Sequence, residues 1–149
     1  MNSRLISVRL AAALALAAGF TAAHADDSAA LAAAAKEPGA VVSASGMIFK
    51  SIKEGTGASP KATDTVKVNY RGTLPDGKVF DASADHGGPA TFPLNRVIPC
   101  WTEGVQLLKV GGKGKLTCPS AIAYGPRGAG GVIGPNATLV FEVELLAIN

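Results

Sequence analysis

The chain has 149 residues, of which 48% are apolar and 17% charged, a balance that suits one globular domain with a single core. Its formal net charge is only +3, and its lysines are scattered instead of forming a basic stripe with interleaved aromatic residues, which argues against nucleic-acid binding. Two cysteines without a CxxC spacing and only two histidines argue against a zinc site, and we expect no metal and no cofactor.

The first 25 residues form a segment of their own. Arg4 and Arg9 precede the apolar run LAAALALAAGFTAAHA, which closes on the small-x-small sequence Ala23-His24-Ala25. This order is typical of a secretory signal peptide and predicts cleavage after Ala25. A transmembrane anchor is the alternative, but the run is shorter than the roughly 20 residues that cross a bilayer. We therefore expect no membrane anchor and a periplasmic or secreted protein.

Residues 26–46 are rich in alanine, serine and glycine and have no stripe of large apolar residues. Alanine favours helix, so residues 29–37 are expected to form a turn or two before Pro38 and Gly39 end it. We interpret this segment as a linker ahead of a domain that spans residues 47–149.

After the linker, the apolar residues mostly follow the period of two that is typical of half-buried strands. Trp101, Val105 and Leu108 instead follow helical spacing, and the pair Gly111-Gly112 is expected to end that short helix. The predicted strands cover residues 47–53, 65–74, 78–83, 90–94, 113–119 and 138–148. The pattern predicts an α+β fold in which an antiparallel sheet of five to six strands curls around one short α-helix.

Two loops interrupt this pattern. The segment from Tyr124 to Ala137 is rich in glycine and proline and has an apolar tip at Val132 and Ile133. Loops of this length in a compact domain are usually functional. The shorter loop ADHGGP contains His86, which we interpret as a solvated loop residue and not as a ligand or a base.

The usual catalytic sets do not occur in the sequence. The chain offers no positioned histidine for a serine triad, no spacing that singles out two carboxylates, and no phosphate-binding glycine motif. Rotation about an X-Pro peptide bond needs none of these groups, although its barrier is ~18–20 kcal/mol. The twisted amide has less charge separation than the planar one, so an apolar pocket with one or two hydrogen bonds to the flanking carbonyls favours the rotation.

Three long blocks of sequence carry a specific pattern: VKVNYRGTLPDGKVFDAS, VIPCWTEGVQLLKVGGKGKLTCP and AYGPRGAGGVIGPNATLVFEVELL. With the spacings between them, they resemble the FKBP-type peptidyl-prolyl isomerases from about Met47 to Ile148. A signal peptide ahead of such a domain is similar to exported bacterial members that act on periplasmic proteins. The resemblance implies a peptidyl-prolyl cis-trans isomerase for exported proteins during folding. The alternative is a chaperone module that binds proline-containing segments with little isomerase activity.

The resemblance also assigns the residues of a proline-binding pocket. Trp101 is expected to form the floor, Tyr124 and the backbone N–H of Ile98 to bind substrate carbonyls, and Asp81 to line the rim as a polar acceptor. The expected walls are Tyr70, Phe80, Val97, Ile98 and Phe141. Considered alone, the wall aromatics also fit the core of any sheet protein.

Several positions depart from the family pattern. Ala90 stands where relatives often have a second pocket aromatic, so Phe92 is expected to be the nearest aromatic on that side. Ala129 replaces a bulkier side chain of some members, and Asn69 replaces a common histidine. We expect these changes to alter affinity and side-chain preference more than basal activity. The substrate-binding candidates are Phe92, Ala90, Val132 and Ile133.

Cys100 stands where the family usually has glycine, and Cys118 follows on the strand after the helix. In the family fold these positions are near enough to form a disulfide, which an exported protein favours. The alternative is a pair of buried thiols that act as small apolar residues.

The resemblance implies the partners as well. We expect proline-containing unfolded or partly folded polypeptides as substrates, and binding of tacrolimus and rapamycin. We also expect a monomer, because the segment ahead of the domain has few large apolar residues for a helical dimerisation arm.

Overall fold

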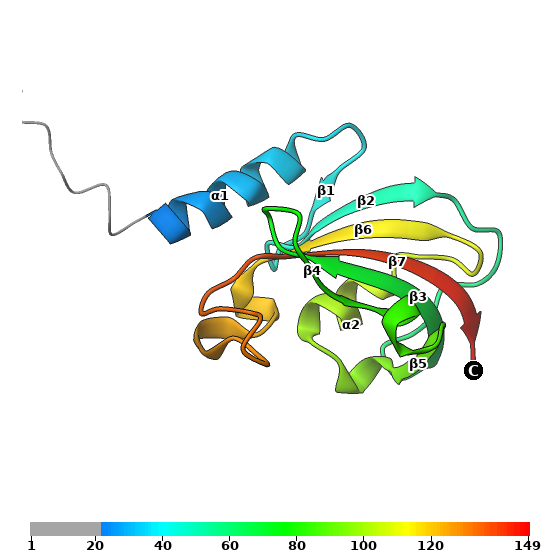
Figure 1. The fold of residues 1–149 in the computed structure, drawn as a ribbon. Coiled ribbons are helices and arrows are strands. Elements are labelled where there is room, and N and C mark those ends of the chain that lie inside the picture. The colour runs from blue at the N-terminus through cyan, green and yellow to red at the C-terminus, as the bar shows by residue number, and fades with distance from the viewer. Residues whose placement is uncertain (1–21) are drawn as a thin grey trace, which may run out of the picture.

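Residues 22–149 are described by a computed structural model, and they form two helices and seven strands (Figure 1). In chain order these are α1 (Ala22–Ala35), β1 (Val41–Val42), β2 (Ile48–Lys53), β3 (Thr65–Thr73), β4 (Val79–Ala82), β5 (Ala90–Pro93), α2 (Pro99–Val105), β6 (Lys113–Cys118) and β7 (Leu139–Ile148). Four short 3₁₀ turns lie between them: η2 (Ser83–His86), η3 (Leu94–Arg96), η4 (Ser120–Ile122) and η5 (Gly125–Arg127).

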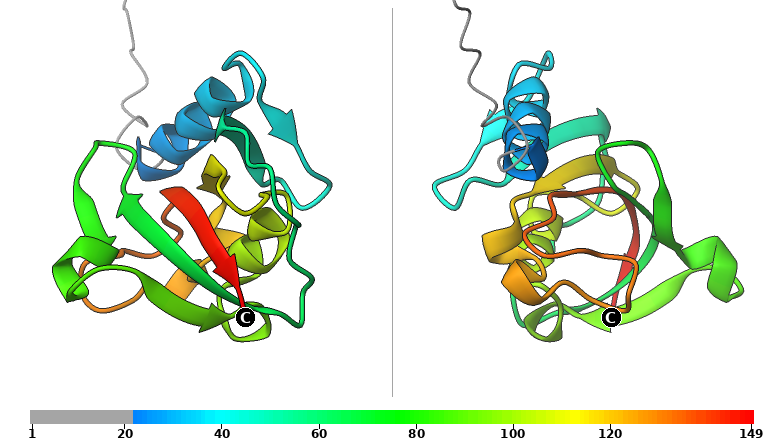
Figure 2. Two further views of the ribbon diagram at one scale, coloured as in Figure 1. Left: turned by 90° about the vertical axis from the view of Figure 1, so that its right-hand side faces the viewer. Right: turned by 60° about the vertical axis from the view of Figure 1, so that its left-hand side comes forward.

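The strands form one antiparallel sheet in the order β1-β2-β6-β7-β3-β4, and β5 pairs with β3. The pairing of β3 with β7 is long and runs from Val66 opposite Ile148 to Thr73 opposite Val140. The sheet arches over α2, which lies on its concave side (Figures 1 and 2). The predicted α+β class, with an antiparallel sheet curled around a short helix, is confirmed.

The core lies between the sheet and α2. Along β7, buried and partly exposed residues alternate, so that Phe141 and Val143 face inward with Val66 and Val68 of β3. The period of two places one apolar row on the concave side of each central strand. Val105 of α2 is fully buried against these rows.

Helix α2 is shorter than predicted, because it ends at Val105 and not at the Gly111-Gly112 pair. The chain continues in tight turns, in which Leu107 donates to the carbonyl of Gly104 and Leu108 to that of Val105. Such i→i+3 bonds narrow the last turn of a helix. Leu108 remains buried, so helical spacing identified the inward residues although the helix itself stops earlier.

The segment predicted as a linker contains more structure than expected. Helix α1 has 14 residues, where the sequence predicted a turn or two, and β1 adds a short strand to β2. Ala34 is buried, and Lys115 of β6 donates to both carboxylate oxygens of Glu37, at 2.7 and 3.0 Å. Both valines of β1 are exposed, so no alternation marked the strand in the sequence.

A disulfide joins Cys100 of α2 to Cys118 of β6, with the Cα atoms 5.9 Å apart. Both residues are fully buried. The first turn of α2 is thereby tied covalently to the sheet, and the alternative of two free thiols is wrong.

Most of the predicted signal peptide lies outside the described residues, and its predicted cleavage site after Ala25 falls within α1. Within residues 22–149, no helix is both long enough and apolar enough to cross a membrane.

Candidate functional site

A cavity of about 470 Å³ opens on the concave side of the sheet, beside the start of α2. Aromatic and aliphatic side chains make up most of its lining. The lining residues are Tyr70, Phe80, Asp81, Phe92, Arg96, Val97, Ile98, Trp101, Tyr124 and Phe141. An apolar cavity with few polar groups is typical of a binding site for a small apolar moiety.

Trp101 lies at the centre of the aromatic lining and is 5% exposed. Its ring meets Tyr70, Phe92 and Phe141 edge to face, at centroid distances of 5.3, 5.6 and 5.4 Å. Such T-shaped pairs are favourable and restrict how the rings can turn. The indole Nε1 is buried and has no hydrogen-bond partner among the described residues, so the small exposed part of the ring consists of carbon atoms.

Each aromatic wall comes from a different strand. Tyr70 lies on β3, Phe80 on β4, Phe92 on β5 and Phe141 on β7. Gly72 makes room for this arrangement, because a Cβ atom at that position would lie 2.5 Å from the ring of Phe80. Phe80 and Phe141 are thus able to meet edge to face at 5.5 Å.

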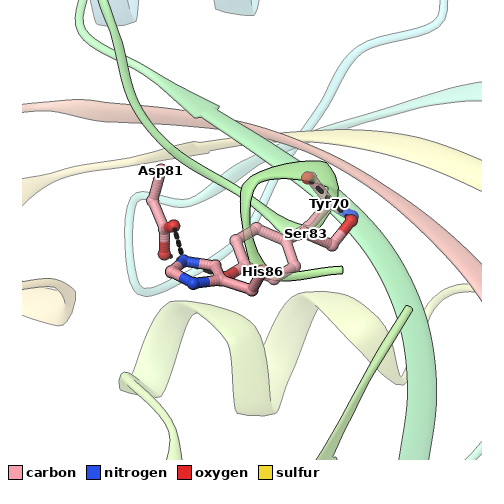
Figure 3. A network of polar contacts seen from close by, with 4 residues as sticks. All are labelled: Tyr70, Asp81, Ser83 and His86. Atoms are coloured by element: carbon pink, nitrogen blue, oxygen red, sulfur yellow. Dashed lines mark hydrogen bonds and ion pairs between the residues drawn. The ribbon is translucent and has the colours of Figure 1, made fainter. Parts of the chain in front are cut away.

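A polar network joins Tyr70, Asp81, Ser83 and His86 (Figure 3), and two of its members, Tyr70 and Asp81, line the cavity. The hydroxyl of Tyr70 donates to Asp81 Oδ2 at 2.9 Å, and His86 Nε2 lies 2.8 Å from Asp81 Oδ1. Ser83 holds the backbone of Tyr70 in place, because its hydroxyl accepts a hydrogen bond from the backbone N–H of Tyr70 at 3.0 Å. Both oxygens of the Asp81 carboxylate therefore have a partner.

The contacts of this network shift the pKa values of Tyr70 and Asp81 in opposite directions. Burial and the hydrogen bond to Asp81 raise the pKa of Tyr70 to about 12, because both favour the neutral phenol. Partial burial pushes the pKa of Asp81 upward, but the hydrogen bonds from His86 and Tyr70 outweigh it and hold that pKa below its usual range. At neutral pH the site therefore combines a neutral tyrosine donor with an ionised aspartate.

Two further donors reach the cavity. Burial, with the nearby charge of Asp81, raises the pKa of Tyr124, so its hydroxyl keeps its proton. That side chain is 40% exposed, at the start of the long glycine-rich loop. Ile98 is the N-cap of α2, and its backbone N–H donates to no backbone carbonyl among the described residues. Both groups are available to a ligand carbonyl.

All eight residues expected to form the floor, walls and rim line the cavity, and so does Phe92. Three substrate-binding candidates do not. Ile133 is buried in the core, Val132 is half exposed away from the lining, and Ala90 pairs with Val68 at the start of β5. The apolar tip of the loop thus turns partly inward, since Ile133 gains more from burial in the core than from exposure.

Two residues at the site were missed or misjudged from sequence. His86 is solvent-exposed in its loop, as predicted, but its Nε2 also lies 2.8 Å from Asp81 Oδ1, a contact that the sequence did not indicate. Arg96 lines the cavity and was not a candidate. Its place directly before the pocket residues Val97 and Ile98 was the available signal. Among the side chains of residues 28–149, no three His, Cys, Asp or Glu residues gather in a group that could hold a metal ion.

Residues 57–146, which supply this cavity, match the family described as FKBP-type peptidyl-prolyl cis-trans isomerase. The chain belongs to this family. The FKBP-type peptidyl-prolyl cis-trans isomerase FkpA of Aeromonas hydrophila is 62% identical over 119 residues, which are 80% of this chain and 44% of that protein. This FKBP-type chain therefore spans less than half the length of that relative.

Solved structures agree with the FKBP-type assignment. The crystal structure of FkpA from Escherichia coli matches with a TM-score of 0.82 at 46% identity, covering 87% of this chain and 60% of that one. A peptidyl-prolyl cis-trans isomerase from Pseudomonas syringae matches with a TM-score of 0.80 at 41% identity, covering 86% and 94%. Both solved structures share the fold of this chain over most of its length.

Proposed function

We propose that this FKBP-type chain catalyses the cis-trans isomerisation of X-Pro bonds in polypeptides. The observation that carries the proposal is the aromatic cavity with Trp101 at its centre and hydrogen-bonding groups on its rim. A prolyl ring fits such a surface, and the family to which the chain belongs supports the same activity. Family membership also supports tacrolimus and rapamycin as ligands.

The proposed mechanism uses binding and exclusion of water. In the planar ground state the amide is stabilised by resonance and by hydration of its charge separation. In the twisted transition state that separation falls, so an apolar cavity stabilises the twisted form relative to the planar one. In the proposal the Tyr124 hydroxyl and the Ile98 N–H hold the flanking carbonyls, and Asp81 keeps Tyr70 oriented at the wall.

An exchange NMR measurement on a proline peptide with leucine before the proline tests the activity. We expect acceleration that rapamycin abolishes, and a loss of roughly tenfold or more in kcat/KM in Trp101→Leu, because a central buried aromatic dominates such sites. Leu107→Ala is the matched control, since Leu107 is half exposed and lies outside the cavity. If the peptide binds but its proline isomerises only at the uncatalysed rate, the result supports the chaperone alternative instead.

We also propose that residues 1–25 direct export to the periplasm and are removed by cleavage after Ala25. The mature protein is proposed to be a monomer. The leader pattern in residues 1–25 supports the export, and cleavage there leaves Asp26–Ala35 of helix α1 in the mature chain. N-terminal sequencing of protein from a periplasmic extract is expected to begin at Asp26. Sedimentation of that protein as a dimer, or a start at Met1, contradicts the proposal.

A further inference from the structure

Arg96 is the cationic member of the cavity lining. It ends the turn η3, whose first residue, Leu94, is fully buried. The N–H of Leu94 donates to the carbonyl of Asp64 at 2.9 Å, and its own carbonyl accepts from the hydroxyl of Thr102. The backbone of η3 is therefore anchored at Leu94, two residues before Arg96, and Arg96 itself is exposed at the edge of the cavity beside Val97.

The two charges of the cavity have different surroundings. The carboxylate of Asp81 is occupied by Tyr70 and His86, so it offers little free charge to a ligand. Among the side chains of residues 28–149, no carboxylate lies within 4.0 Å of the Arg96 guanidinium. A ligand in the cavity thus meets one charge that is already paired and one cation that is free to pair.

We propose that Arg96 makes this site select polypeptides with an aspartate or glutamate next to the proline. The inference rests on the proposed binding of prolyl segments in this cavity. A guanidinium binds a carboxylate through two parallel hydrogen bonds, whereas it gains little from an amide or an apolar side chain. Because Arg96 is exposed to solvent, we expect a modest preference of roughly two- to fivefold, the size of an exposed ion pair.

The test compares peptides that differ only in glutamate or glutamine, placed before or after the proline. Trp101 is the chain's only tryptophan, so its fluorescence reports binding independently of catalysis, and exchange NMR reports isomerisation. We expect tighter binding of the glutamate peptide at one of the two positions, and a preference that shrinks as salt is raised. Equal affinities for both peptide pairs overturn the inference.

Charge reversal assigns the preference to one side chain. Arg96→Gln is expected to abolish the glutamate preference, and Arg96→Glu to reverse it toward a matching lysine peptide. Arg71→Gln is the control with the same change in charge, because Arg71 follows Tyr70 on β3 and strand alternation directs it to the opposite face of the sheet. A preference that survives in Arg96→Gln overturns the inference.

The two proposals fail in distinguishable ways. Selective binding of glutamate peptides without faster isomerisation refutes the enzymatic function and supports the role of Arg96. Faster isomerisation without any glutamate preference refutes the role of Arg96 and supports the enzymatic function.

Discussion

Tyr70 serves the site through both parts of its side chain. Its ring packs edge to face against Trp101 and Phe92, while its hydroxyl donates to Asp81. The aromatic floor and the polar rim are therefore coupled through one residue. A phenol is well suited to this position, because burial and Asp81 both keep its proton in place.

Removal of the Tyr70 hydroxyl distinguishes the contribution of its hydrogen bond from that of its ring contacts. In Tyr70→Phe the ring contacts remain, and we expect a loss of about 1 kcal/mol in the free energy of unfolding, typical of one hydrogen bond. The pKa of Asp81 should rise toward its ordinary value because one of its donors is gone. Carboxyl NMR titration measures this rise. Tyr124→Phe is the control, and an identical shift in both variants contradicts the assignment.

The low pKa of Asp81 also predicts how stability depends on pH. An aspartate in an unfolded chain has a pKa of about 3.9. Because the folded pKa is lower, the contribution of Asp81 is fully present above the unfolded value and is lost as pH falls through the folded value. We expect Asp81→Asn to remove this part of the acid destabilisation in urea titrations below about pH 4.

A variant of His86 should change the acid dependence of stability by an intermediate amount. His86→Gln removes one partner of Asp81 and leaves Tyr70, so its acid dependence should lie between those of the wild type and Asp81→Asn. If the free energy of unfolding depends on pH in the same way in all three proteins, the hydrogen bonds to Asp81 do not lower its pKa as described.

At the scale of elements, α2 is short and depends on its neighbours. A helix of 7 residues is not stable by itself in water. Its first turn carries both Cys100, bonded to β6, and Trp101, at the centre of the cavity. The disulfide and the binding surface therefore belong to the same turn.

Loss of this disulfide should destabilise the fold. The cysteines are 18 residues apart, and in the chain-entropy model such a crosslink contributes roughly 3 kcal/mol. We expect the double variant Cys100→Ala/Cys118→Ala to unfold in urea with a free energy lower by about this amount. Reduced wild-type protein should behave similarly. An unchanged urea midpoint in both samples contradicts this prediction.

The packing of α2 on β6 depends on a glycine. A Cβ atom at Gly104 would lie 2.5 Å from one methyl group of Leu116 and 2.8 Å from the other. Although alanine favours helix, we expect Gly104→Ala to destabilise the protein by about 1–3 kcal/mol, as overpacked cores do. Gly134→Ala is the control, since nothing lies within 4 Å of its added Cβ. Thermal unfolding distinguishes them, and equal midpoints contradict the expectation.

At the scale of the whole molecule, α1 is joined to the sheet by few contacts. Glu37, in the turn that follows α1, bridges Lys115 and, at 3.8 Å, Lys50. The hydrogen bond from Lys115 holds the pKa of Glu37 below its usual range. The ion pair is therefore present at neutral pH, and it weakens as pH falls through the lowered pKa of Glu37. The side chains of this bridge are partly exposed, which limits its strength.

The association of α1 with the sheet should therefore be selectively sensitive to Lys115. We expect Lys115→Met to reduce hydrogen-exchange protection in α1 and to change global stability by less than about 1 kcal/mol. Lys67→Met, on exposed β3 surface, is the control. Unchanged protection in Lys115→Met would show that Ala34 and its neighbours hold the helix without the ion pair.

Much of the fold could be predicted because its signals are local. Alternation along residues 65–73 and 139–148 identifies the inward rows of β3 and β7, since the side-chain period of a strand depends only on its own backbone. The resemblance then assigned the eight floor, wall and rim residues, because its motifs record which strands meet. Alanine propensity indicated only part of α1, and the strand β1 could not be predicted, because its pairing with distant residues of β2 stabilises it.

The sequence by itself thus determined the α+β class, the family and the aromatic composition of the pocket. Only the tertiary structure decided that His86 pairs with Asp81, that Ile133 is buried in the core, and that Arg96 lines the cavity. These three residues lie in turns and loops, where no periodic pattern specifies direction. Their partners are set by how the chain closes around α2, and that closure depends on the packing of the whole domain.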